Sequence, residues 1–64
     1  MITHIMFTDA NKNVHVAPIE RIFLDGDSVD LTVTVVNAVH DYRYPVGKIE
    51  FERLRKILID WIDD

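Results

Sequence analysis

The sequence predicts an α+β fold: a small antiparallel β-meander of about four short strands with one C-terminal amphipathic helix packed on one face. Three observations predict it. Residues 29–35 alternate strictly between apolar and polar side chains, which is typical of a strand with one buried face. The dipeptide Asp25-Gly26 supplies the positive φ of tight hairpin turns. From residue 47 onward, apolar residues recur at helical spacing.

The N-terminal half of the chain is predicted to form extended segments joined by turns. Residues 2–7 are the first strand, with apolar side chains on both faces. A cluster of turn formers then leads into a second strand at residues 14–16, so a hairpin is expected here. Residues 19–24 are predicted as a bent extended segment, opening with a helical turn at Pro18, that pairs antiparallel with residues 29–36.

The C-terminal half is predicted as a short strand followed by the helix. Residues 37–41 are a loose connection, and residues 42–46 are the last strand, with Pro45 at an edge. After Gly47, six apolar residues share an arc of about 140° on a helical wheel: Phe51, Leu54, Ile57, Leu58, Trp61 and Ile62. The predicted core joins this arc to the valine-rich strand and consists of Val29, Leu31, Val33, Val35, Leu54, Leu58 and Trp61.

The order of hairpin, Asp-Gly turn, valine-rich strand and C-terminal helix is similar in outline to small bacterial proteins of the flagellar FlbD type. This likeness covers most of the chain and rests on hydrophobic pattern. It implies the fold and no functional residue.

Length and composition indicate a single small domain, residues 1–64, without a covalent staple. A chain this short buries only about 60% of its unfolded surface, so small domains often rely on disulfides, metals or self-association. The chain has no cysteine, which excludes disulfides and thiolate zinc sites and agrees with a cytoplasmic location. No apolar run approaches the ~20 residues of a membrane helix, and the first residues lack the features of a signal peptide.

The apolar content exceeds what one helix on one sheet face can cover. Ile5 and Phe7 lie in a strand that is apolar on both faces, Phe23 lies between two other apolar residues, and Ile59 widens the apolar arc of the helix. Edge strands further favour association. We therefore expect a contact surface made of Ile5, Phe7, Phe23 and Ile59.

Motifs for catalysis or metal binding are weak, so we expect no enzyme and no cofactor. There is no cysteine nucleophile, Ser28 is the only serine, and two glycines cannot build a phosphate-binding loop. If His4 and His15 lay opposite one another, they could bind zinc together with His40 or Asp41. Ordinary half-exposed histidines are the simpler interpretation.

Two classes of function remain. The favoured one is a non-catalytic protein–protein interaction module, which self-associates or acts as a small subunit or inhibitor of a larger protein. The alternative is a nucleic-acid-binding accessory protein, because residues 43–56 carry net charge +3 (five basic minus two acidic residues) beside two tyrosines that could stack on bases. Its contact residues would be Arg43, Lys48, Arg53, Arg55 and Lys56. The net charge of −4 argues against this alternative.

Overall fold

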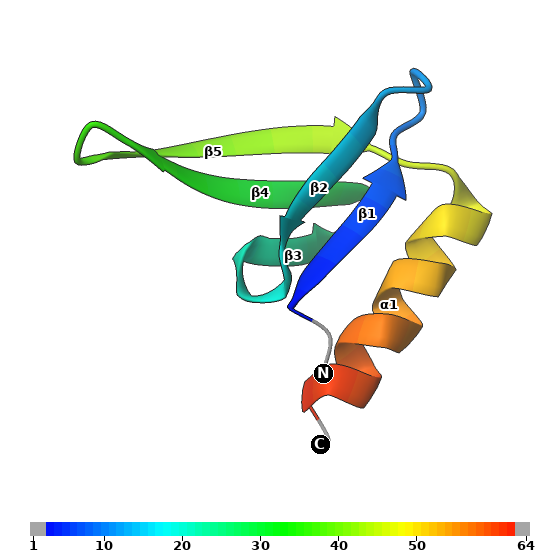
Figure 1. Ribbon diagram of the computed structural model, residues 1–64. Helices are drawn as coiled ribbons and strands as arrows, with labels where there is room; N and C mark the ends of the chain where they lie inside the picture. The colour runs from blue at the N-terminus through cyan, green and yellow to red at the C-terminus, as the bar shows by residue number, and fades with distance from the viewer. Residues whose placement is uncertain (1–2, 63–64) are drawn as a thin grey trace.

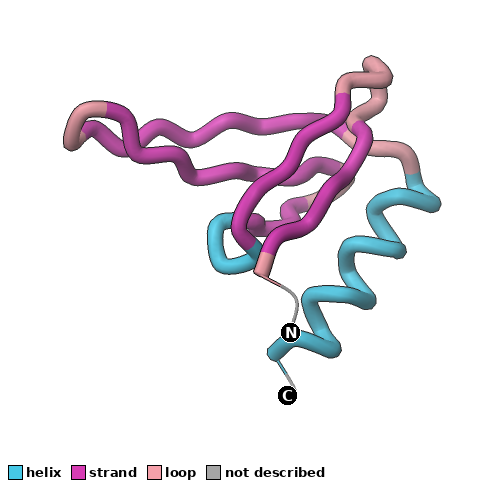
Figure 2. The backbone as a smooth tube through the Cα atoms, viewed as in Figure 1, coloured by secondary structure: helices cyan, strands magenta, loops and turns pink. Residues whose placement is uncertain are grey.

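A computed structural model describes residues 3–62 and confirms the predicted α+β fold (Figure 1). Figure 2 shows the same backbone coloured by secondary structure. In chain order, the elements are β1 (His4–Thr8), β2 (Val14–Pro18), the 3₁₀ turn η1 (Ile19–Arg21), β3 (Ile22–Asp25), β4 (Ser28–Val35), β5 (Ala38–Pro45) and α1 (Lys48–Ile62). Ile2, which we expected at the start of the first strand, lies outside the described residues.

The strands form two antiparallel sheets where the sequence predicted one meander. β1 pairs with β2, and β3, β4 and β5 form a second sheet in that order. Ala10 N–H donates to the Pro45 carbonyl at 2.8 Å, which connects the first hairpin to the end of β5. Ile19 N–H donates to the Thr3 carbonyl at 3.0 Å and joins the two ends of the hairpin. In Figure 1 the β1–β2 hairpin crosses the three-stranded sheet, and α1 runs beside β1.

The core lies between the two sheets and is closed on one side by α1. Its buried apolar residues come from every element except β5: Ile5, Phe7, Ala17, Ile19, Ile22, Val29, Leu31, Val46 and Leu54. Phe51, Ile57 and Leu58 of α1 pack against this cluster and are partly buried. Packing of the apolar stripe, more than helix propensity, therefore holds α1 in place.

Ile5 and Phe7 belong to this core, which corrects their expected place on a contact surface. Successive residues of β1 point to opposite faces, so Ile5 and Phe7 face inward while His4 and Met6 face outward. A single meander would leave one face of β1 open. The second sheet covers that face here, and it buries Ile5 and Phe7, two of the four residues that the sequence assigned to an interface.

β4 and β5 continue beyond the core as a two-stranded arm, residues 32–42, which extends to the left in Figure 1. Val33 and Val35, predicted in the core, are 37% and 48% exposed because the first hairpin covers only the proximal half of this sheet. Of residues 37–41, predicted as a loose connection, residues 38–41 pair with β4 instead and Asn37 lies in the turn. The turn between the strands has φ of 48° at Val36 and 66° at Asn37, the two positive values of a type I′ turn.

α1 extends beyond the strands that it covers. It has 15 residues and β1 has five, or about 22 Å of helix beside about 17 Å of strand. Trp61, predicted in the core, is therefore 41% exposed in the last turn. Within residues 3–62, no helix combines the length and the apolar composition that crossing a membrane requires.

Candidate functional site

An apolar groove separates β3 from the C-terminal half of α1. We call it the β3–α1 groove, and its volume is about 330 Å³. Eight of its ten lining residues are apolar, and Glu20 and Arg55 are the two charged ones. The apolar lining residues are Ile19, Ile22, Phe23, Leu24, Leu58, Ile59, Trp61 and Ile62.

Two of the four residues predicted for a contact surface meet in this groove. Phe23 is 55% exposed on β3, and Ile59 is 44% exposed on α1. They come together because β3 lies at the edge of its sheet and α1 passes along that side of the molecule. Exposed large apolar side chains from two elements form one continuous lining, as binding surfaces for proteins do.

Trp61 and Ile62 complete the groove, and sequence reasoning missed them by placing both on the core-facing arc. The arc itself is real, since Leu54 and Leu58 lie along it. The length of α1 could have predicted their exposure. A helix of this many residues extends past a strand as short as β1, so its last turn is uncovered.

The basic residues of the nucleic-acid alternative are dispersed, and the three arginines each contact a carboxylate. Arg43 on β5 lies 2.8 Å from Asp25, and Arg55 on α1 lies 2.9 Å from Glu52. The hydrogen bond to Asp25 raises the pKa of Arg43. Arg53 pairs with Glu50. Lys48 and Lys56 are exposed on α1. The arginine side chains therefore face acidic neighbours, whereas a phosphate-binding row would leave them open.

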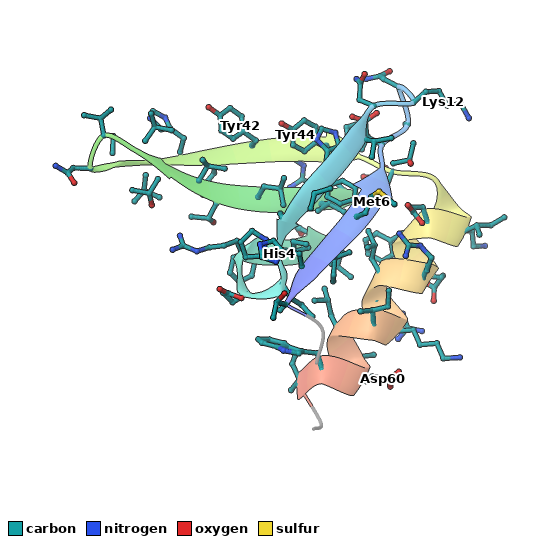
Figure 3. The ribbon with its side chains drawn as sticks, in the orientation of Figure 1. His4, Met6, Lys12, Tyr42, Tyr44 and Asp60 are labelled. Atoms are coloured by element: carbon teal, nitrogen blue, oxygen red, sulfur yellow. The ribbon has the colours of Figure 1, made fainter. Side chains whose placement is uncertain are left out.

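The two tyrosines beside the basic stretch differ in environment. Tyr42 is exposed on the arm, whereas Tyr44 is half-buried between the sheets. The Tyr44 ring centroid lies 4.1 Å from that of His15 and 6.5 Å from that of Phe7. Figure 3 labels both tyrosines on β5. Tyr44 is thus part of an internal aromatic cluster, which leaves it unavailable to stack on a base.

Asp9 forms a second polar centre in the turn of the first hairpin. Its Oδ1 accepts hydrogen bonds from the backbone N–H groups of Asn11 and Asn13 at 2.8 and 3.0 Å, and its Oδ2 lies 2.7 Å from Nε2 of His15. The hydrogen bond to His15, followed by the backbone hydrogen bonds, outweighs burial and lowers the pKa of Asp9. Both oxygens of this carboxylate are engaged within the first hairpin, so we interpret the pair as structural.

Glu50 and Arg53 of α1 cover the outer edge of β1. Glu50 Oε2 accepts a hydrogen bond from Thr8 N–H at 2.9 Å, and Arg53 donates to the Met6 carbonyl at 2.7 Å. The hydrogen bond from Arg53 lowers the pKa of Glu50. These side chains occupy backbone groups that an additional strand would need, which is one way that proteins protect a sheet edge.

The histidines do not come together as the zinc hypothesis required. His4 lies opposite Pro18 and His15 lies opposite Phe7, so the two imidazoles point to different faces of the first hairpin, and His40 lies on the arm. Figure 3 shows His4 away from the arm. Among residues 3–62, no group of three or more histidine or carboxylate side chains is arranged to hold a metal ion.

These features describe a small α+β protein with two facing sheets, a projecting arm and an apolar groove beside its helix. Comparisons with protein-family models, with curated proteins and with solved structures gave no significant match to this chain.

Proposed function

We propose that this protein is a non-catalytic interaction module that binds an extended apolar segment of a larger protein in the β3–α1 groove. The observation that carries the proposal is the apolar lining shared by β3 and α1, in which Phe23, Ile59 and Trp61 are all between 41% and 55% exposed. Phe23 and Trp61 are aromatic, and aromatic side chains contribute much of the binding energy in protein interfaces. The lack of cysteine supports a cytoplasmic site of action.

The place of the groove favours an extended partner. β3 has a neighbouring strand on one side only, and three consecutive residues of β3 line the groove. A segment laid along this edge gains main-chain hydrogen bonds from β3 and inserts alternate side chains between β3 and α1. The charged residues Glu20 and Arg55 have opposite signs, so they can orient a partner segment without selecting for net charge.

Selection from a random peptide library displayed on phage tests this proposal. Trp61 is the only tryptophan in the chain and lines the groove, so its fluorescence reports occupancy directly. We expect selected peptides that carry apolar residues at alternate positions, shift the Trp61 emission to the blue and bind the Phe23→Asp variant at least about tenfold more weakly.

Ile49→Asp is the matched control, because Ile49 is 88% exposed in the first turn of α1 and lies outside the groove. The affinity of the Ile49→Asp variant for the peptides should equal that of the unmodified chain. Both variants should keep the native thermal melting transition, since both replaced side chains are mostly exposed. Peptides that bind Phe23→Asp as tightly as the unmodified chain, or a library that yields no binder, would refute the groove as a binding site.

A further inference from the structure

The distal half of β4 has an open backbone edge. β3 pairs with β4 only as far as Ile22 opposite Leu31, and the chain before Ile22 turns away as η1. Residues 32–35 therefore have a strand partner on the β5 side alone. Peptide groups in a strand alternate in direction, so about half of the N–H and C=O groups of this segment point away from β5.

This edge faces a hollow that another strand can enter. The hollow has a volume of about 410 Å³. Its other walls are the last residues of β2 and the side chain of Arg21, with residues 31–34 of β4 on the remaining side. In Figure 1 the arm stands clear of β1 and α1, so neither element blocks the approach of a strand along the arm.

Two of the other sheet edges, those of β1 and β5, carry protection that this one lacks. Glu50 and Arg53 occupy backbone groups on the edge of β1. β5 carries Asp41 and Arg43 and ends at Pro45. Residues 32–35 read Thr-Val-Thr-Val, with high strand propensity and neither charge nor proline. An edge of this composition is a template for pairing with another chain.

We propose that a second copy of this chain pairs with the open edge, β4 against β4 and antiparallel, about a two-fold axis. Such a contact is isologous, so each copy offers the same four residues to the other. With the two-fold axis at Thr34, Thr34 lies opposite Thr34 and Val33 lies opposite Val35, and both are favourable cross-strand pairs. The dimer then contains one continuous sheet in the order β5, β4, β4, β5.

A second copy fits this edge better than it fits the edge of β5. Antiparallel self-pairing of β5 brings the charges of Asp41 or Arg43 close to those of the other copy, whereas the β4 segment is uncharged. Pairing also brings Val36 at the tip of each arm, 90% exposed in one chain, toward the hollow of the other.

Each copy contributes one strand edge, one arm tip and one hollow, which places the contact at the small end of specific interfaces. The dimer should therefore dissociate in the micromolar range, and it forms independently of any partner in the β3–α1 groove. The proposal is tested by light-scattering molar mass from about 5 µM to about 1 mM.

We expect the mass to rise from 7.5 kDa toward twice that value with concentration. Thr34→Lys, on the open edge, should remain monomeric because the two lysines would meet across the axis. Val39→Lys is the matched control: Val39 lies directly opposite Thr34 but on β5, so this variant should dimerise like the unmodified chain.

Disulfide trapping gives an independent readout, since the chain has no cysteine of its own. Thr34→Cys should form a reducible covalent dimer at concentrations where Ile49→Cys, exposed on α1, does not. A chain that stays monomeric over the whole series, or a dimer that Thr34→Lys leaves intact, would overturn the proposal. If Phe23→Asp alone dissociates the dimer, self-association uses the groove, which overturns the β4 contact and leaves the groove as an interaction surface.

Discussion

Asp9 shows how one side chain can supply the partners that a turn lacks. Two backbone hydrogen bonds close the turn between β1 and β2, from Asp9 N–H to the Asn13 carbonyl and from Lys12 N–H to the Asp9 carbonyl. The Asp9 carboxylate accepts from two further N–H groups of the turn while contacting His15. The turn formers in this segment were visible in the sequence, because aspartate and asparagine bond nearby backbone groups. The contact with His15 depends on strand register, which the sequence did not fix.

The pH dependence of stability follows from Asp9 and Glu50. Contacts in the folded state lower the pKa of both carboxyls, so the folded state binds fewer protons than the unfolded state around their ordinary values of about 4. Stability is therefore fully present above about pH 5 and decreases as the pH falls through the folded-state pKa values. Thermal melting between pH 7 and pH 2.5 should show a midpoint that falls at the acid end.

Asp9→Asn separates the contribution of one carboxyl. The amide oxygen can still accept from Asn11 and Asn13, but the group no longer ionises. We expect a lower melting midpoint at pH 7 and a shallower decrease toward acid than in the unmodified chain. Equal slopes for the two proteins would show that Asp9 does not titrate with folding.

At the scale of elements, the sequence predicted those with a strong period and missed those set by turn geometry. The alternation of residues 29–35 predicted β4, and the apolar arc after Gly47 predicted α1. β5 was predicted at less than its full length, because Val36 and Asn37 adopt positive φ without a glycine to signal it. In the groove, Phe23 and Ile59 were predictable as surplus apolar residues. Their proximity was not, since it depends on the packing of α1 beside β3.

Glu50 and Arg53 hydrogen-bond to the edge of β1, and this contact leads to a prediction for α1. Glu50→Ala removes the acceptor of Thr8 N–H and the partner of Arg53, and should lower the free energy of unfolding by about 1–2 kcal/mol. Glu52→Ala is the matched control, because its pairing with Arg55 is half-exposed and should contribute at most about 0.5 kcal/mol. Urea denaturation measures both, and hydrogen exchange should show faster exchange of the Thr8 amide in Glu50→Ala. Equal losses in the two variants would contradict this role.

At the scale of the whole molecule, one small core has to hold two sheets and a helix together. Leu54 is the single α1 side chain that is fully buried, and it contacts a cluster supplied by both sheets. The arm and the last turn of α1 lie outside this cluster. The molecule therefore concentrates its stability at one end and leaves its two candidate contact surfaces, the groove and the open edge of β4, at its margins.

Because the stability of the molecule depends on this one cluster, we predict that Leu54→Ala destabilises the whole fold. The cavity should cost about 2–5 kcal/mol, a large part of the stability that a domain of this size can have. Because both sheets share the cluster, circular dichroism and Trp61 fluorescence should report one transition at a much lower denaturant concentration. Ile49→Ala, an exposed position on the same helix, should shift the transition by less than about 0.5 kcal/mol. Separate melting of α1 and of the strands in Leu54→Ala would contradict this prediction. The two sheets would then be stable without the helix, and the groove would have one wall that is only loosely attached.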